Sequence, residues 1–296
     1  MQGEKTAFIT GCSSGFGLLT AVTLAKRGWR VLATMRDLAR KDALEAAART
    51  AGILDRIEIL PLDVTESAQI AALAEMLGKR AAPLHAMVNN AGFAMAGFCD
   101  DVSDQELRQQ FDTNFFAHAA VTRALLPQLR RQGFGHIVML SSISGRSAFP
   151  GIGSYSASKH ALEGWTESLR LEMLPLGIQV ALVEPGSFAT NIWTHGTVVA
   201  QRSVASSHHE ALSQPLEARA SPNAHRMARF VAKVSRERKR PDAQMVADRI
   251  AQILETPRPR LRYVVGRDAR MLLVLRALLP WRLYERILVK ASGIEE

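Results

Sequence analysis

Cysteine is scarce in this sequence, which holds only Cys12 and Cys99 among its 296 residues. Two thiols cannot build the disulfide framework of a small secreted scaffold, so the cysteine usage favours a reducing compartment. A secretory leader is lacking as well, because Met1–Lys5 leads directly into an apolar segment without a basic region and a long apolar stretch. These two absences predict a cytoplasmic protein.

The sequence also lacks a hydrophobic run long enough to cross a membrane. The most apolar C-terminal stretch, Met271–Leu279, contains Arg276 and lies between Arg270 and Arg282, so it cannot span a bilayer as one helix. We find no spacing typical of zinc ligands, no internal repeat and no low-complexity tract. A metal site is therefore not expected.

Negative charge is in short supply, because 28 Asp and Glu residues face 37 Lys and Arg residues, a formal net charge of +9. The surplus is concentrated in residues 226–240, which contain seven basic side chains and one acidic side chain, Glu237. No aromatic stacking motif or recognition-helix pattern accompanies this run, so nucleic-acid binding is not expected. We interpret the run as a solvated helix face.

Contact with a membrane surface is an open alternative for the C-terminal region. The basic run and the Leu/Arg-rich segment that follows could lie on anionic lipid and give access to lipophilic substrates. We favour a different role for the apolar residues of this segment, in which they close the substrate pocket or form a subunit interface. These residues are Met271, Leu272, Leu275, Leu278 and Leu279.

Short apolar segments alternate with helical periods along most of the chain. The predicted strands are Thr6–Thr10, Val31–Met35, Ile57–Leu60, Leu84–Asn89, His136–Ser141, Ile178–Val183 and Leu261–Val265. The predicted helices are Gly15–Gly28, Leu38–Ala51, Ser67–Lys79, Ser103–Arg131, Tyr155–Leu174 and Asp242–Leu254. Strands that are apolar throughout and alternate with helices indicate a parallel sheet covered on both faces.

We therefore predict an α/β fold, a doubly wound Rossmann-type parallel seven-stranded sheet with helices on both faces. The segment order favours one domain over residues 1–296. Residues 191–240 contain no clear strand and are expected to form a substrate-side insertion or lid, and residues 266–291 amphipathic helices that break near Pro280. Ligands of such folds bind beyond the carboxyl ends of the strands.

The first predicted strand leads into a glycine-rich segment, Thr10–Gly17, with the sequence TGCSSGFG. Glycine lets backbone approach a ligand without a Cβ in the way, and the start of the next helix offers N–H groups to a phosphate. The spacing differs from G-x-G-x-x-G, so the segment alone could be an ordinary turn. Its place between a strand and a helix favours a dinucleotide site. The expected cofactor-binding residues are Gly11, Ser13, Ser14, Gly15, Phe16 and Gly17.

The second predicted strand ends at Met35 and is followed by Arg36 and Asp37. An NAD-preferring site usually has an acid here to bind the ribose 2′-hydroxyl. The guanidinium of Arg36 could instead form charge-assisted bonds to a 2′-phosphate. A surface arginine, or a partial preference for NAD through Asp37, is the alternative. We expect NADP, with NAD as the less favoured cofactor.

Two further strand ends carry candidate cofactor contacts. Asp63 could accept a hydrogen bond from an adenine amine, or it could cap the helix near Ser67. The amides and small residues of the Asn-Asn-Ala-Gly segment 89–92 favour close packing around a cofactor, although Asn89 could instead tie neighbouring strands together. The cofactor-binding candidates here are Asp63, Val64, Asn90, Ala91 and Gly92.

A serine, a tyrosine and a lysine follow the fifth predicted strand. Positions i and i+4 of a helix share a face, so Tyr155 and Lys159 project together toward the strand end that carries Ser142. The free tyrosine pKa of ~10 is poorly matched to neutral pH, and a nearby ammonium and an oxidised nicotinamide would lower it. Tyr155 would then exchange a proton with an alcohol or carbonyl oxygen held by Ser142. A Tyr-x-x-x-Lys pair alone is common by chance, so the interpretation depends on the order of all the motifs.

This combination resembles the short-chain dehydrogenase/reductase family in its compact single-domain form, over about residues 5–192. The motifs that carry the resemblance are T-G-x-x-x-G-x-G, N-N-A-G and a serine with Y-x-x-x-K. The resemblance implies that Ser142 binds the substrate oxygen, that Tyr155 is the catalytic acid/base, and that Lys159 activates it; both Tyr155 and Lys159 would also contact the cofactor. It further implies that Asn114 holds a water in the proton relay, in a helix that must bend there.

The resemblance extends to Val183-Glu184-Pro185-Gly186, a segment that passes the nicotinamide, and implies cofactor contacts from Pro185, Gly186 and Thr190. The stretch Thr10–Asp37 is similar to the branch that contains hydroxysteroid and retinol dehydrogenases, which implies a hydrophobic alcohol or carbonyl substrate. Because family members are often dimers or tetramers, a homodimer or homotetramer is expected by analogy.

Two functions are compatible with these observations. The favoured one is an NADP(H)-dependent oxidoreductase that interconverts a hydrophobic secondary alcohol and ketone, or a primary alcohol and aldehyde. The alternative is a non-catalytic protein that senses NADP(H) on the same fold. All four catalytic positions, Asn114, Ser142, Tyr155 and Lys159, are filled, which favours the enzyme.

Overall fold

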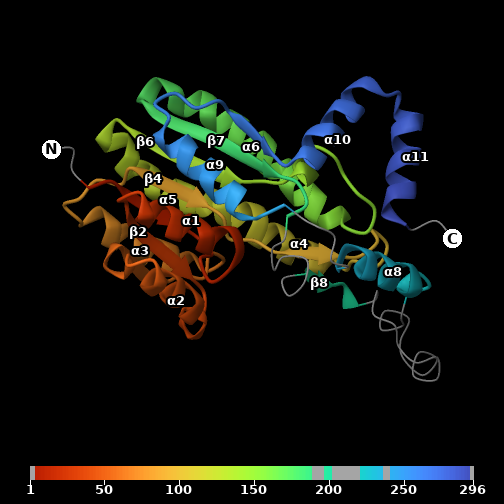
Figure 1. The fold of residues 1–296 in the computed structure, drawn as a ribbon, viewed down its shortest axis with the longest axis horizontal. Helices are drawn as coiled ribbons and strands as arrows, with labels where there is room; N and C mark the ends of the chain where they lie inside the picture. The colour runs from red at the N-terminus through yellow and green to blue at the C-terminus, as the bar shows by residue number, and fades with distance from the viewer. Residues whose placement is uncertain (1–3, 189–196, 202–220, 236–240, 294–296) are drawn as a thin grey trace.

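A seven-stranded parallel sheet forms the centre of the molecule (Figure 1). The computed structural model describes residues 4–188, 197–201, 221–235 and 241–293. The strand order is β3-β2-β1-β4-β6-β7-β9, and every neighbouring pair runs parallel. The strands are β1 Thr6–Ile9, β2 Arg30–Met35, β3 Ile57–Pro61, β4 Ala86–Asn89, β6 Gly135–Leu140, β7 Ile178–Pro185 and β9 Arg262–Val265. The predicted doubly wound α/β fold is confirmed.

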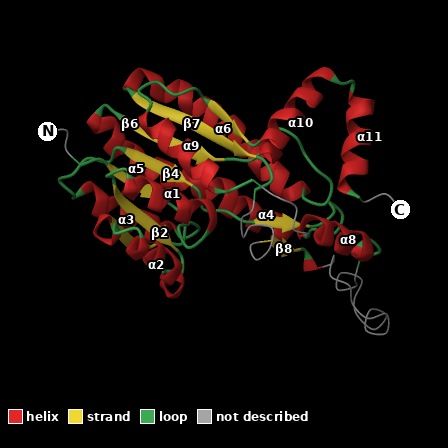
Figure 2. Ribbon diagram, in the orientation of Figure 1, coloured by secondary structure: helices red, strands yellow, loops and turns green. Residues whose placement is uncertain are grey.

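Successive residues of the central strands pack on opposite faces of the sheet, as the two-residue period of a strand requires. On β1, Ala7 and Ile9 belong to the core beneath one set of helices, whereas Phe8 belongs to the core beneath the other set. The first set is α1 Gly15–Lys26, α2 Asp42–Thr50 and α9 Gln244–Glu255. The second set is α3 Ser67–Gly78, α5 Ala117–Gln132 and α6 Gly153–Met173. Figure 2 shows the helices on both sides of the strands.

The chain changes direction across the sheet at β1. From β1 it winds outward to β2 and β3, then returns to β4 on the other side of β1 and continues to β6, β7 and β9. The loops that follow β1 and β4 therefore diverge to opposite faces and leave a crevice between them, where ligands bind in folds of this kind.

A small second sheet lies outside the central sheet. β5 (Ala94–Ala96) pairs in parallel with β8 (Thr197–Val199), and α8 (Ala224–Ser235) follows later in the chain. The expectation that residues 191–240 contain no strand is wrong at β8. Three residues are too few to produce a recognisable period in the sequence, and β8 is defined by its backbone pairing with β5 rather than by its own pattern.

The long predicted helix over residues 103–131 is interrupted at its centre. α4 (Asp104–Phe111) leads into a π-helix, Asp112–Phe116, and then into α5. Asn114, the position where the sequence requires a bend, lies inside the π-helix and is fully buried. A π-helix widens one turn of the backbone and is found mostly at functional sites. The distortion therefore falls on the residue assigned to the proton relay.

Two C-terminal helices leave the body of the sheet (Figure 1). α10 (Arg267–Leu278) and α11 (Trp281–Ser292) are separated by Pro280, where the sequence predicts a break. The helices are tied to loops at the edge of the sheet by two side chains. In α10, Asp268 accepts a hydrogen bond from the backbone N–H of Ser187 at 2.7 Å, and in α11 the hydroxyl of Tyr284 bonds that of Ser147 at 2.5 Å.

We expect the change Tyr284→Phe to destabilise the protein by ~1–3 kcal/mol, because it leaves the buried Ser147 hydroxyl without its partner. Urea denaturation measures the loss. The matched control is Tyr263→Phe, whose hydroxyl accepts a hydrogen bond from the exposed backbone N–H of Arg260. Equal losses in the two variants would contradict the anchoring role of Tyr284.

Candidate active site

The glycine-rich loop after β1 is held in a fixed shape by Asn90, which follows β4. The side-chain amide of Asn90 donates to the carbonyl oxygens of Thr10 and Gly11, at 2.8 and 2.9 Å. In return, the hydroxyl of Thr10 accepts from the backbone N–H groups of Asn90 and Ala91, at 2.9 and 3.0 Å. The first and fourth strand ends are thus locked together at the crevice.

Glycine is required at two points of this loop. Gly11 has a φ of +72°, and a Cβ on it would lie 2.8 Å from the Cα of Ala91. A Cβ on Gly17 would overlap the carbonyl of Gly11 and the amide of Asn90. α1 begins at Gly15, so its free N–H groups and positive dipole end face this cradle. The residues present therefore fit a dinucleotide pyrophosphate.

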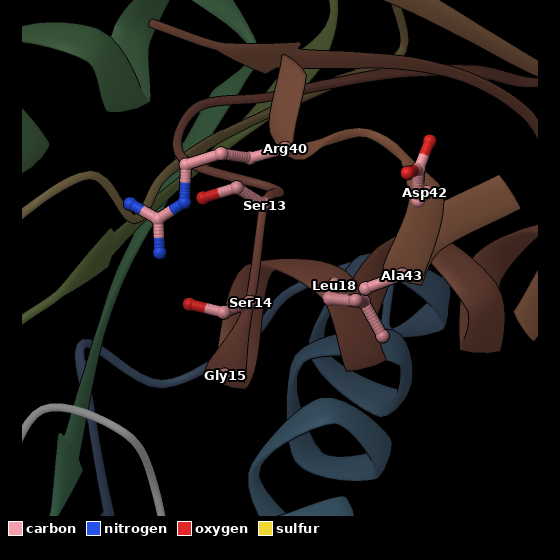
Figure 3. A pocket seen from close by; sticks show the side chains of 7 residues that line it. All are labelled: Ser13, Ser14, Gly15, Leu18, Arg40, Asp42 and Ala43. Atoms are coloured by element: carbon pink, nitrogen blue, oxygen red, sulfur yellow. The ribbon is translucent and has the colours of Figure 1, made fainter. Parts of the chain in front are cut away.

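A cavity of about 460 Å³ opens beside the loop (Figure 3). Its wall includes Arg40, which the sequence analysis did not single out. In Figure 3 the Arg40 side chain passes over Ser13, and its guanidinium lies on the side of the Ser13 and Ser14 hydroxyls. The lining residues are Ser13, Ser14, Gly15, Leu18, Arg40, Asp42 and Ala43. Arg40 is brought here by the short 3₁₀ turn Leu38–Arg40 that follows β2. Its spacing of four residues from Arg36 was the available signal.

The surroundings of Arg36, Asp37 and Asp63 bear on whether the site prefers NADP or NAD. Arg36 is 76% exposed, with its Nε 3.9 Å from a carboxylate oxygen of Asp63. Asp37 caps the 3₁₀ turn by accepting from the N–H of Ala39 at 2.9 Å. Asp63 accepts from both the N–H and the hydroxyl of Thr65 through Oδ1, so this oxygen stabilises a turn. Both carboxylates therefore have local structural partners.

The segment 89–92 contains Asn89, which has a structural role, and Gly92, which packs closely against Asn114. Asn89 donates to the hydroxyl of Thr122 on α5 at 2.9 Å and to the sulfur of Met139 on the neighbouring strand β6 at 3.2 Å, so it has a structural role. Asn114 donates to the carbonyl of Phe93 at 2.9 Å and accepts from the N–H of the same residue at 3.1 Å. A Cβ on Gly92 would lie 3.0 Å from Asn114 Oδ1, so this glycine permits close packing.

His118 is a buried residue of the site that the sequence analysis missed. Its Nε2 lies 2.6 Å from the carbonyl oxygen of Ala91. Burial, and secondarily the charge of Lys159, lower the pKa of His118 to about 3, so the imidazole is neutral at physiological pH. His118 is the second residue of α5, directly after the π-helix that contains Asn114. It braces the segment 89–92 from α5.

Ser142, Tyr155 and Lys159 come together at the carboxyl end of β6, as predicted. Tyr155 is hydrogen-bonded to Ser142 and is 5% exposed. The ammonium of Lys159 lies 5.9 Å from the centre of the Tyr155 ring and donates to the carbonyl of Leu140 at 2.8 Å. Gly145 packs against the backbone of Lys159, so the loop after β6 approaches α6 closely.

Burial shifts the two titratable groups of this trio in opposite senses. It raises the pKa of Tyr155, and the hydrogen bond with Ser142 opposes the rise. It lowers the pKa of Lys159 to about 8, and the charge of Glu163 opposes the fall. The phenol is therefore protonated at neutral pH in the protein without ligand. The expected lowering of the Tyr155 pKa by Lys159 does not overcome burial in this state.

The segment after β7 lies against the start of α10. Pro185 pairs with Val265 of β9, and Gly186 donates to the carbonyl of Val265 at 2.8 Å. A Cβ on Gly186 would meet the carboxylate of Asp268. Phe16 of the glycine-rich loop packs edge-on against Phe188, with ring centres 5.9 Å apart. The segments after β1 and β7 thus meet. Thr190 lies outside the described residues.

An apolar wall faces Tyr155 from the small second sheet and α8. The side chains in this cluster are Ala94, Ala96, Ile152, Tyr155, Met227 and Phe230, with Phe98, Phe149, Val199 and Val231 packed against it. Met227 and Phe230 lie on one face of α8, three residues apart. Among the described residues, no group of three or more His, Cys, Asp or Glu side chains could hold a metal ion.

A pyrophosphate cradle at the switch point of a doubly wound sheet, next to a buried tyrosine and lysine, defines an NAD(P)-dependent oxidoreductase. The family model described as short chain dehydrogenase matches residues 5–197. The chain belongs to the short-chain dehydrogenase/reductase family, as the sequence motifs indicated.

Three known proteins illustrate this relationship. The uncharacterized oxidoreductase YusZ of Bacillus subtilis is 40% identical over 295 residues, 98% of this chain and 99% of that protein. Human retinol dehydrogenase 8 is 40% identical over 204 residues, 68% of this chain and 64% of that protein. A short chain dehydrogenase/reductase from Burkholderia phymatum, solved in complex with NAD, is 26% identical with a TM-score of 0.75 and covers 93% of each chain.

Proposed function

We propose that this enzyme is an NADP(H)-dependent oxidoreductase that interconverts a hydrophobic alcohol and the corresponding ketone or aldehyde. The observation that carries the proposal is the burial of Ser142, Tyr155 and Lys159 at one strand end, beside the pyrophosphate cradle and an apolar wall. We also propose that the chain works as one domain, because a single sheet takes strands from Thr6 to Val265.

The proton chemistry follows from the three side chains. When bound, the nicotinamide supplies or accepts the hydride. Ser142 holds the substrate oxygen by a hydrogen bond, within reach of the Tyr155 hydroxyl that it already contacts. Tyr155 gives its proton to a carbonyl oxygen in reduction and takes it from an alcohol in oxidation. Because burial keeps Tyr155 protonated at neutral pH in the protein without ligand, the phenol has a proton available for a carbonyl oxygen.

Lys159 and Asn114 support the proton transfer. The ammonium of Lys159 favours the phenolate of Tyr155 and holds the nicotinamide ribose. The side-chain amide of Asn114 is occupied by Phe93 and Ser158, so we assign the relay water to its backbone within the π-helix. Such a water would connect Lys159 to solvent after Tyr155 has given up its proton.

Replacing the proton donor tests the mechanism. We expect Tyr155→Phe to lower kcat by ~10²–10⁴-fold, with NADPH affinity changed only a few-fold because the ring is kept. An NADPH-consumption screen over steroids, retinoids, quinones and aliphatic or aromatic carbonyls provides the substrate, and Tyr263→Phe is the control.

Two outcomes of this screen would contradict the proposal. Full activity in Tyr155→Phe would overturn the role of the phenol. A wild-type protein that binds NADPH but acts on no member of the panel would favour the sensor alternative.

Two arginines support NADP over NAD. Arg40 lines the cavity beside Ser13, and Arg36 is exposed at the end of β2. Asp37, the acid that would favour NAD, accepts a hydrogen bond from Ala39. We therefore assign Arg36 and Arg40 to the 2′-phosphate, and Oδ2 of Asp63, the oxygen nearer to Arg36, to the adenine amine. The Burkholderia phymatum relative was solved with NAD, so family membership alone does not decide between NAD and NADP, and the preference of this enzyme has to be measured.

Removing either arginine is expected to weaken NADPH binding far more than NADH binding. Each charge-assisted bond is worth ~1.5–3 kcal/mol, so Arg40→Ala or Arg36→Ala should raise the NADPH dissociation constant ~10–100-fold. Fluorescence titration measures both cofactors. The control is Arg49→Ala, which removes an equal charge from an exposed ion pair on α2. Equal losses for NADPH and NADH would refute the assignment.

The apolar wall around Tyr155 supports a hydrophobic substrate. Met227 and Phe230 of α8, with Ile152, offer no charged group to a substrate near the phenol. A hydrocarbon chain or ring system would gain roughly 25 cal/mol for each Å² of apolar area removed from water there. The 40% identity with a retinol dehydrogenase supports the same class.

The C-terminal helices carry an exposed apolar surface with a basic rim. Met271, Val274, Leu278 and Trp281 are each more than half exposed. Six basic residues lie in this segment, against the two acids Asp268 and Glu285, and Asp268 already accepts a bond from Ser187. Within the described ranges, no helix has the length and apolarity to cross a bilayer. The sequence favoured a substrate-pocket or subunit-interface role for these residues. Because several of them are exposed and a second copy would bring the same positive charge, we propose instead that this surface rests on an anionic membrane.

Vesicle binding tests this surface. At about 0.15 M salt, we expect the protein to co-sediment with vesicles of phosphatidylcholine containing phosphatidylglycerol, and Leu278→Glu to abolish this. Leu171→Glu is the control, because Leu171 is as exposed as Leu278 but lies on α6. A dimer in light scattering that Leu278→Glu disrupts, without vesicle binding, would assign the surface to a second copy instead.

A further inference from the structure

Four charged side chains that the proposed reaction does not use meet behind the catalytic lysine. Glu163 lies one helical turn after Lys159 on α6. Glu184 lies at the end of β7, directly before Pro185. Arg262 begins β9, the strand beside β7, and Arg146 lies in the loop after β6. Three adjacent strand segments and one helix therefore contribute to a single cluster.

One arginine nitrogen serves both carboxylates of this cluster. The Nε of Arg262 is 3.1 Å from Oε2 of Glu163 and also 3.1 Å from Oε1 of Glu184. This nitrogen carries a single N–H, and its hydrogen bond goes to Glu163. Arg146 reaches the other oxygen of Glu184 only at 3.5 Å, from a side chain that is 41% exposed.

The two carboxylates are removed from water and incompletely satisfied. The side chain of Glu184 is 0% exposed and that of Glu163 is 6% exposed. Within the part of the chain that the structure describes, no hydrogen bond of good geometry reaches either oxygen of Glu184, and one reaches Glu163, from Arg262. Two like charges buried around one N–H are costly, and a shared proton removes that cost.

We propose that Glu163 and Glu184 form a buried carboxylate pair that holds one proton at neutral pH and, by its remaining negative charge, keeps Lys159 charged. Both glutamates are positioning residues, because they act on the reaction through Lys159. This inference rests on the proposed function for its kinetic consequence, while the shared proton is a property of the fold.

The titration of the groups agrees with this arrangement. Burial and, after it, the neighbouring Glu163 charge raise the pKa of Glu184 to about 7, against the charges of Arg146 and Arg262. Burial also raises the pKa of Glu163, against the Ser141 hydroxyl and the charges of Arg262 and Arg146. The two protons belong to the pair rather than to either residue.

Lys159 depends on this charge because, among the described residues, Glu163 is the negative group whose charge raises the pKa of Lys159. Burial lowers its pKa to about 8, and Glu163 is the group that opposes the fall. From α5 it is faced by His118, which is neutral, and from β6 by the carbonyl of Leu140. On its own helix it is faced by Tyr155, which burial keeps protonated. A second negative charge appears in the pair as the pH rises, at the point where Lys159 would otherwise lose its proton.

Kinetics test the link to Lys159. Glu163→Gln moves the remaining negative charge of the pair onto Glu184 and removes the carboxylate whose charge raises the pKa of Lys159. The variant therefore favours earlier deprotonation of the Tyr155–Lys159 unit. We expect the pH profile of kcat/KM for alcohol oxidation to shift toward acid by about 0.5 unit or more. Glu167→Gln is the matched control, since Glu167 pairs with Arg262 at 2.7 Å but is 50% exposed. An unchanged profile in Glu163→Gln, or an equal shift in Glu167→Gln, would overturn the link.

Thermal unfolding tests the shared proton without turnover. The folded pKa of Glu184 is raised, so its protonation stabilises the fold below pH 4.5 and this stability is lost as pH rises through about 7. Glu184→Gln keeps the neutral form at every pH. We therefore expect its Tm, relative to wild type, to rise by ~3 °C or more between pH 5 and pH 8. Glu163→Gln should behave in the same sense.

The outcomes separate this inference from the proposed function. A Tm difference that does not change with pH in either variant overturns the shared proton, whatever the enzyme catalyses. If wild type turns over no alcohol or ketone, the proposed function fails. The protonation of Lys159 is then followed through the NADPH affinity, measured from pH 6 to pH 10. An alkaline loss of affinity at the same pH in Glu163→Gln and wild type would then refute the coupling.

Discussion

Every strand of the central sheet runs in the same direction, so all carboxyl ends meet along one edge, and the site depends on this constraint. Parallel strands need crossovers, and the strand order changes direction at β1, where the loops after β1 and β4 separate. Residues distant in sequence, such as Gly11, Asn90 and Ser142, share one small region because the sheet delivers them there. Helices on both faces then exclude water from the strands that carry them.

Backbone at this edge is held by side chains from neighbouring loops. Asn90 fixes the carbonyls of the glycine-rich loop, Asn114 fixes Phe93, and Asp268 fixes Ser187. Each brace satisfies backbone groups that have no strand or helix partner. Residues of the cofactor motifs are thus structural as well, and the loss of one brace would disturb the loop it holds before any ligand contact is considered.

Burial also sets the electrostatics of the site. The same exclusion of water raises the pKa of Tyr155 and lowers that of Lys159, which favours the neutral form of both groups. Proton transfer through Tyr155 needs Lys159 in its charged form. We propose that the negative charge of Glu163, on the next turn of α6, maintains that form. Arg262 in turn reaches Glu163 because β9 lies beside β7, at the far edge of the sheet.

The sequence by itself determined the α/β fold, the positions of the seven main strands and the family, because strand period and motif order are local properties. The helix break at Asn114 was also readable, since the motif required it. Tertiary structure decided what depends on distance between remote segments. β8 is defined by its pairing with β5. Arg40 lines the same cavity as Ser13 because a 3₁₀ turn brings it there. His118 contacts the carbonyl of Ala91, which follows β4, from α5. The charge cluster behind Lys159 was equally invisible, because Glu163, Glu184 and Arg262 are ordinary residues in sequence. Only burial around one arginine nitrogen gives the two carboxylates their altered protonation.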